Sequence, residues 1–403
     1  MIYEKAMRSG PRASEESFSL MWGQSRSAKV LCLLVGLTLG LLVPPISSLE
    51  RALHLILIFL SGSLGFLFGV KVELRILRRI SRAVWGLSLF QAFFTLLVVT
   101  IPLTFILPIW GRTETGVDLL RISAALGIVA SVTMPPAVSL LSKRTERKRA
   151  VFRVVETMAL SGDVVVFVFL GFLLMLQRGE AISLVGIEIG GAGGRLLTAL
   201  ICGGLVGCLA DFVSRRERSL QERVYLVVGV LLVGIGTAGA LGVPSVFIGL
   251  IAGAWLINAT SRRVAVLETM DRIRDFVEGT LLVLIGAVLP MASLLRSRDG
   301  LIALGVGVLL FALRLLGKTL GTGIGARMFV KMPKAQRKGL GGTLLPQAEI
   351  AVAVAYGQNL GDMLLFAVLL SVLLALLAAP YGWRWAFGSG KCEVRSAKCG
   401  GCP

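Results

Sequence analysis

Four charged side chains fall inside long apolar stretches of the chain. Asp163 lies in a run rich in valine and phenylalanine, Arg314 and Lys318 share a second run, and Glu349 lies in a third. A charge near the centre of a bilayer costs at least about 2.5–3.5 kcal/mol on insertion scales, and such groups usually mark ion or proton pathways. We therefore treat these four residues as candidates for binding ions or balancing their charge.

Asp163 is the first candidate for carrying a proton or a cation. It lies about twelve residues, or roughly 18 Å, into its apolar segment, close to the middle of a membrane. Its neighbours Ser161, Gly162 and Val164 supply no counter-charge, and a carboxyl group removed from water holds a proton more readily. The alternative is a carboxyl group that only holds a neighbouring helix by a hydrogen bond, and we favour the functional interpretation.

Arg314 and Lys318 are one helical turn apart, so they lie on one face of their segment. Arg314 is deep enough that it must pair with a carboxylate or with the carbonyl ends of broken helices. Lys318 is nearer the end of the segment, so it either joins Arg314 or extends to the membrane surface. We expect both residues to compensate charge at a site.

The two glutamates each have two interpretations. Glu349 could join the cation pathway, or neutralise the exposed N–H groups of a half-helix, which we favour slightly. Glu156 precedes Asp163 by seven residues, so it lies on the same face about 10 Å nearer the cytoplasm. It could line a cytoplasmic entry funnel or simply begin its helix in solvent.

Prolines interrupt two of the apolar segments. One break contains Thr133, Pro135 and Pro136, and the other contains Pro346 and Gln347. Proline cannot continue a helix without losing a backbone hydrogen bond. Interrupted segments at corresponding places in two halves of a chain are the best sequence indication of a transport site.

The composition indicates which elements position these residues. Of 403 residues, 55% are hydrophobic and 16% are charged, with a mean hydropathy of +0.84; soluble domains carry about 25% charged residues. Apolar stretches long enough to cross a bilayer recur throughout the chain. We expect about twelve helices, at 29–47, 51–70, 83–110, 117–142, 151–177, 194–214, 222–240, 243–260, 272–295, 299–326, 339–357 and 361–382.

The basic residues orient these helices. The net charge of +19 would suggest nucleic-acid binding in a soluble protein, but most of the 42 Lys and Arg residues occupy alternate gaps between apolar segments. This bias predicts a multi-pass protein of a bacterial-type inner membrane, with both termini cytoplasmic and no nucleic-acid partner. The other loops hold only Arg51, Arg112, Arg121, Arg178, Arg195, Arg296 and Arg298.

These observations predict an all-α polytopic membrane protein with an inverted repeat and two discontinuous crossing helices. Segments one to five and eight to twelve pair as halves of opposite topology, which places the two proline breaks at corresponding positions. We expect residues 29–382 to form the transmembrane domain, between cytoplasmic tails at 1–28 and 383–403.

Sequence signatures of enzymes are missing. The chain has no Walker, HExxH or GxSxG sequence and a single histidine, so we predict that it is not an enzyme and needs no cofactor. Three cysteines in the C-terminal tail, Cys392, Cys399 and Cys402, fall short of the four ligands of a structural zinc site. We therefore expect no metal site.

Four segments together resemble the monovalent cation/proton antiporter superfamily, which has the sodium/proton exchanger fold, and within it the Kef-like branch. Residues 57–74 resemble the second helix and its basic linker, 130–135 the broken fourth helix, 314–321 the basic tenth helix and 345–349 the eleventh. Asp163 takes the place of the essential aspartate of the fifth helix. The likeness spans about 50–382, and the order and spacing of the segments make it specific.

The resemblance implies a secondary transporter that exchanges Na⁺ or K⁺ for H⁺. It implies a core at 83–177 and 299–382 that moves against a scaffold formed by the remaining segments, and a homodimer in the lipid bilayer. Asp163 would carry cation or proton, Thr133 would be a ligand or break residue, and Arg314 would compensate charge.

Two positions depart from the family pattern. Gly162 stands where Asp or Asn is common, and Met134 follows Thr133 where a polar residue is common. A single carboxylate favours electroneutral exchange. The alternatives are a sodium-coupled organic-anion symporter, for which Thr133, Thr343 and Gln347 are the obvious Na⁺ ligands, and a membrane sensor or partner protein that does not transport.

Overall fold

A computed structural model gives the arrangement of most of the chain. It describes residues 11–42, 47–110, 116–133, 149–175, 182–184, 187–189, 192–215, 219–240, 242–330, 340–347 and 349–387. Pro135, Pro136, Met134 and the three tail cysteines lie outside these ranges, as does the second half of the segment expected at 117–142.

Helices make up nearly all of the described structure, which confirms the predicted all-α class. The one departure is a short antiparallel hairpin, β1 (Ile182–Leu184) with β2 (Ile187–Ile189), between two helices. The helices are α2 (Pro11–Leu42), α3 (Ser47–Gly69), α4 (Leu74–Leu77), α5 (Arg82–Ile109), α6 (Val117–Ser131), α8 (Arg149–Met175), α9 (Ala192–Ser214), α10 (Leu220–Ala240), α11 (Ser245–Ala259), α12 (Arg263–Val288), α13 (Met291–Arg296), α14 (Arg298–Gly325), α16 (Ile350–Gly357) and α17 (Asp362–Phe387), with a π-helical turn, η2 (Ala326–Val330), after α14.

Seven of the described helices are long and apolar enough to cross a membrane, and two more apolar stretches, Ser27–Leu42 and Ser245–Ala259, are shorter. Every one of the expected segments overlaps a described helix. The main boundary difference is at the start, where α2 begins at Pro11 rather than near residue 29.

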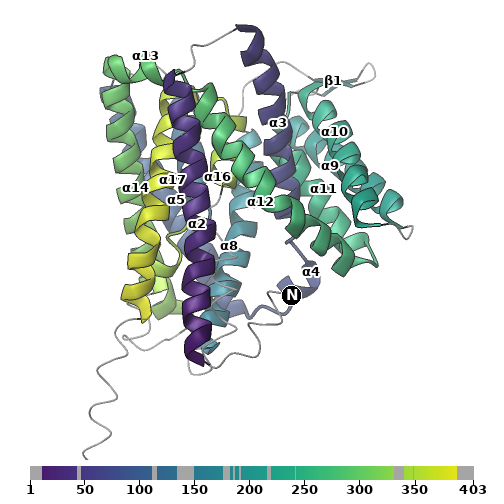
Figure 1. The fold of residues 1–403 in the computed structure, drawn as a ribbon, viewed down its shortest axis with the longest axis horizontal. Helices are drawn as coiled ribbons and strands as arrows, with labels where there is room; N and C mark the ends of the chain where they lie inside the picture. The colour runs from purple at the N-terminus through teal and green to yellow at the C-terminus, as the bar shows by residue number, and fades with distance from the viewer. Residues whose placement is uncertain are drawn as a thin grey trace, which may run out of the picture.

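The helices pack as two groups. The first, which we call the core group, comprises α5, α6, α8, α14, α16 and α17, with α14 packed on both α5 and α17; α16 packs on α6 and α17 and also on α3 of the second group. The second, the scaffold group, comprises α2, α3, α9, α10, α11 and α12, in which α3 packs on α11 and α2 on α12. Figure 1 shows α14, α17 and α5 together on one side and α9, α10 and α11 on the other.

Glycines allow α3 and α11 of the scaffold group to approach closely. Gly249 and Gly253 of α11 face the backbone of α3, and Gly65 and Gly69 of α3 face the backbone of α11. A Cβ atom at any of these positions would overlap a carbonyl oxygen of the other helix. Such small-residue faces replace the hydrophobic effect as the basis of helix association within a bilayer.

We expect the substitution Gly253→Val to destabilise the protein by about 1–3 kcal/mol, because the new side chain must push α11 away from Phe66 of α3. Thermal unfolding in detergent measures the effect. Gly236→Val in α10 is the matched control, since none of the described residues lies within 4 Å of its Cβ position. Equal losses for the two variants would contradict the close-contact interpretation.

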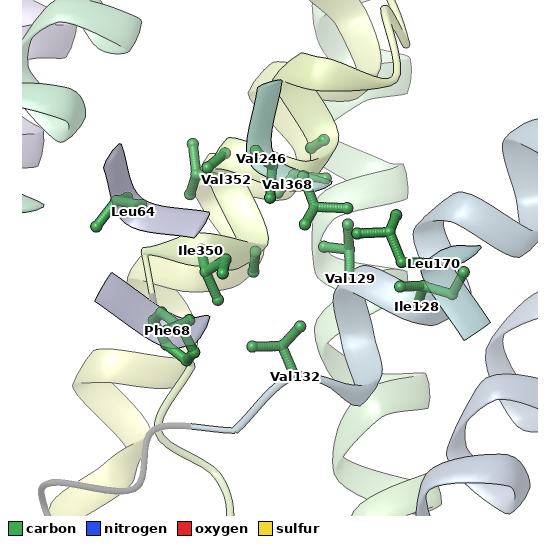
Figure 2. Close-up of a cluster of buried hydrophobic side chains, with 14 of the residues drawn as sticks. Leu64, Phe68, Ile128, Val129, Val132, Leu170, Val246, Ile350, Val352 and Val368 are labelled. Carbon is green, nitrogen blue, oxygen red and sulfur yellow. The ribbon is translucent and has the colours of Figure 1, made fainter. Parts of the chain in front are cut away.

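The two groups meet at a buried apolar cluster that surrounds the helix breaks. Figure 2 shows side chains of the scaffold group lying beside the end of α6 and the start of α16. The polar side chains at the breaks, Thr133, Arg314, Lys318 and Gln347, are buried as well, so they depend on one another for hydrogen bonds. The labelled members of the cluster are Leu64, Phe68, Ile128, Val129, Val132, Leu170, Val246, Ile350, Val352 and Val368.

Candidate functional site

The break in the fourth segment leaves helix carbonyl groups exposed inside the protein. Helix α6 ends at Ser131, and Val132 turns the chain out of the helix with ψ of 141°. The last four carbonyl groups of a helix have no partner within it. Here the Val132 N–H donates to the Ile128 carbonyl at 3.3 Å, which leaves the carbonyls of Val129, Ala130 and Ser131.

Each remaining carbonyl receives a donor from a distant segment. The Gln347 side chain donates to the Val129 carbonyl at 2.9 Å, the Arg314 guanidinium to Ala130, and the Lys318 ammonium to Ser131 at 2.6 Å. The C-terminal end of a helix carries partial negative charge. The two cations are therefore held by the end of α6, and the buried backbone groups are satisfied.

Arg314 also joins this break to the second one. Its Nη2 donates to the carbonyls of Leu345 and Pro346 at 3.1 and 3.4 Å. The side chain is completely buried, and its Nε has no hydrogen-bond partner in the described part of the chain. Arg314 thus binds carbonyl groups at both helix breaks. Carbonyl groups were one of the two kinds of partner expected for a guanidinium buried this deeply; a carboxylate was the other.

Asp163 of α8 lies at the end of α6. The Thr133 N–H donates to its Oδ1 at 3.2 Å, while its Oδ2 is buried and has no hydrogen-bond partner among the described residues. Lys318 donates to the Thr133 hydroxyl at 2.7 Å, so Thr133 lies between the carboxylate and the ammonium group. The charges of Lys318 and Arg314 both act on Asp163.

Serine hydroxyls fix the helices around the carboxylate. The hydroxyls of Ser88 in α5 and Ser161 in α8 are 2.6 Å apart, and the Ser131 hydroxyl donates to the Ala92 carbonyl of α5 at 3.2 Å. Both α6 and α8 are thereby tied to α5. In the described part of the chain, nothing lies within 4 Å of the Cβ position of Gly162, the residue that precedes Asp163.

The structure therefore brings together Asp163, Thr133, Arg314, Lys318 and the break at Pro346 and Gln347. Lys318 is fully buried and does not extend to a membrane surface. Glu156 falls within α8, and Pro135 and Pro136 lie outside the described residues.

Glu349 does not share these contacts. It occupies the N-cap position of α16 but makes no side-chain cap hydrogen bond. Instead its Oε1 lies 2.8 Å from the ammonium nitrogen of Lys29. Glu349 therefore stands at the start of the half-helix, where the favoured expectation places it, and its ionic partner is Lys29.

Sequence reasoning missed two charged residues, Lys29 and Glu278, which are buried and paired. Lys29 adjoins the polar N-terminal segment, so its position in the sequence is that of an ordinary cytoplasmic basic residue. Glu278 has apolar neighbours on the side toward Leu281. A buried carboxylate beside an apolar run needs a charged partner, and this neighbourhood is the sequence feature that could have identified Glu278.

Comparison with known proteins identifies the family and the fold. The family model described as "Sodium/hydrogen exchanger, transmembrane" matches residues 27–387. A structure of the sodium proton antiporter MjNhaP1 from Methanocaldococcus jannaschii at pH 8 matches with a TM-score of 0.56 and 16% identity, covering 92% of this chain and 100% of that one. An electron-microscopy structure of MjNhaP1 gives 0.55 and 16%, covering 90% and 92%. No curated protein sequence matches the chain. At this identity the two structures show a shared fold.

Proposed function

The chain belongs to the sodium/hydrogen exchanger family, and we propose that it exchanges Na⁺ or K⁺ for H⁺ across a membrane through the carboxylate of Asp163. The observation that carries this proposal is the state of that carboxylate. One oxygen accepts a hydrogen bond from Thr133, and the other is buried with no partner among the described residues. A buried carboxylate oxygen without a partner needs a proton or a cation to offset its desolvation.

The mechanism follows from competition for this oxygen. A proton on Oδ2 removes the charge that attracts a cation, and a bound cation excludes the proton, so the two ions occupy Asp163 in turn. Thr133 supports the site because its N–H orients the carboxylate and its hydroxyl oxygen accepts a hydrogen bond from Lys318. Glu349 is left out of this ligand set because its described partner is Lys29.

Arg314 and Lys318 compensate charge in this proposal. They bind the carbonyl ends at the two breaks, so the site keeps its shape whichever ion Asp163 holds. Preorganised charges of this kind cost no rearrangement at the moment of ion exchange.

Alternating access requires the site to face each side of the membrane in turn. In our proposal the core group carries Asp163 and moves against the scaffold group, as the packing into two groups allows. The distribution of basic residues supports cytoplasmic termini in an inner membrane. A homodimer through the scaffold is proposed from the family resemblance alone.

The contacts do not favour a sodium-coupled organic-anion symporter. Its Na⁺ ligands would have to come from Thr133, Thr343 and Gln347. The Thr133 hydroxyl accepts from Lys318, the Thr343 hydroxyl donates to Leu340, and the Gln347 amide donates to Val129. Of these three side chains, only Gln347 has an oxygen that lacks a hydrogen-bond partner among the described residues, so they do not form a cage of free neutral oxygens around a cation.

The proposal predicts electroneutral exchange, since one carboxylate binds one proton or one monovalent cation. Purified protein in liposomes should exchange at the same rate, within about two-fold, when a gradient of the permeant anion thiocyanate imposes a potential. A carrier that moves one net charge gains or loses about 2.3 kcal/mol per 100 mV. A strong dependence of the rate on potential would contradict the one-carboxylate mechanism.

A further inference from the structure

A second buried charge cluster lies apart from Asp163. The Lys29 ammonium of α2 is 2.7 Å from Glu278 Oε2 of α12 and 2.8 Å from Glu349 Oε1 beside α16. All three residues are buried, with exposed fractions of 7%, 3% and 1%. Arg274 of α12 also pairs with Glu278, at 3.0 Å. One lysine therefore serves two carboxylates.

Lys29 and Glu278 belong to the same rigid pair of helices. A Cβ atom at Gly36 or Gly40 of α2 would overlap backbone atoms of α12 or of the residue after it, and Gly286 of α12 meets the backbone of α2. Backbones this close cannot slide past one another without separating. Lys29 and Glu278 therefore stay together within the scaffold group.

Glu349 belongs to the core group and adjoins the second helix break. It follows Gln347, which holds the Val129 carbonyl, and Pro346, whose carbonyl accepts from Arg314. A force on Glu349 is thus transmitted to the break that borders Asp163. The ion pair between Lys29 and Glu349 crosses the boundary between the two groups.

We propose that Lys29 is a positioning residue of the exchange cycle: its contact with Glu349 holds the core group against the scaffold group in the conformation seen here, and must open for the core group to move. The inference rests on the proposed function, which requires that movement. Lys29 acts through Glu349 and does not touch the transported ion.

Opening this contact affects the two partners unequally. Lys29 keeps Glu278, and Glu278 keeps Arg274. Glu349 loses its described ionic partner, and its Oε2 has no hydrogen-bond partner in the described part of the chain. A buried charge left without a partner is costly, so the cost of opening is carried by Glu349.

This asymmetry predicts opposite effects for two isosteric variants. We call the conformation with the Lys29–Glu349 contact closed and the one without it open. Glu349→Gln removes the buried charge that would lose its partner on opening, so the closed conformation should lose population about ten-fold relative to the open one. Glu278→Gln removes the other described carboxylate that pairs with Lys29. Opening would then leave both Lys29 and Glu349 without a described ionic partner, so the closed conformation should gain population by a similar factor. A ten-fold change corresponds to about 1.4 kcal/mol.

Electron spin resonance distances between the two groups measure these populations. One label is placed on Cys208 of α9, which is exposed, and the other on a cysteine introduced at Leu320 of α14, which is 51% exposed. The other native cysteines are replaced by serine, and the full chain is studied in liposomes at fixed pH and cation concentration. Lys29→Met should behave as Glu349→Gln does, and Lys29→Arg should restore the unsubstituted distribution.

The possible outcomes separate the two proposals. Two distances in the labelled parent protein, with shifts of opposite sign in Glu349→Gln and Glu278→Gln, would support the positioning role. Shifts of the same sign, or none, would overturn it while leaving the exchange function intact. A single distance under all conditions would overturn both the movement and the role of Lys29. Two distances without any cation-driven proton flux would instead overturn the proposed function.

Discussion

Replacing Asp163 with asparagine is expected to reduce cation/proton exchange to the background of protein-free liposomes while the protein stays folded. The amide keeps the shape of the carboxyl group and can still accept the Thr133 N–H. It cannot bind a proton or offer a charged oxygen to a cation. Exchange is measured as dye-reported proton flux, and folding by gel filtration and thermal unfolding.

Asp211→Asn in α9 is the matched control. Asp211 is also largely buried, but it pairs with Arg215 on the next helical turn of the scaffold group. We expect this variant to exchange at close to the unsubstituted rate. Normal exchange by Asp163→Asn would show that Asp163 has a structural role only.

Replacing Arg314 with leucine should lower the free energy of unfolding by about 3 kcal/mol or more. The change removes the donor to the carbonyls of Ala130, Leu345 and Pro346, and each buried polar group left unsatisfied costs about 1–3 kcal/mol. Unfolding in mixed detergent micelles measures the loss. Arg314→Lys should recover only part of it, because a single ammonium group does not reproduce the planar fork that reaches both breaks.

The control for Arg314 is Arg272→Leu. The Arg272 side chain is 62% exposed and pairs with Glu268, which is 55% exposed, and exposed ion pairs contribute about 0–1 kcal/mol. An Arg314→Leu variant as stable as this control would contradict the view that Arg314 joins the two breaks.

The sequence predicted the parts of the fold that depend on local pattern. Apolar segment length located the helices, and the prolines located both breaks, so that the end of α6 at Ser131 and the start of α16 at Ile350 lie within a few residues of Thr133 and Gln347. The depth of Arg314 required carbonyl or carboxylate partners. In the structure Arg314 binds carbonyl groups at both breaks, which is the first of those two possibilities.

The remaining contacts depend on segments far apart in the chain. Lys29 and Glu278 are separated by 249 residues, and no local pattern shows that they meet. Lys29 is the first residue of the expected segment 29–47 and adjoins a polar segment, so it resembles the many cytoplasmic basic residues. In the structure α2 begins at Pro11, which places Lys29 well within the helix. Lys318 could equally have extended to the surface, and only the position of the α6 carboxyl end shows that it binds there.

Cation-driven proton flux of the unsubstituted protein is the most direct test of the central claim. Protein in liposomes that have been acidified inside is given Na⁺, K⁺ or Li⁺ in turn, across pH 6–9, while a pH-sensitive dye reports the interior. We predict that at least one of these cations drives protons out of the liposomes. No flux with any of them, from protein shown to be folded, would contradict cation/proton exchange.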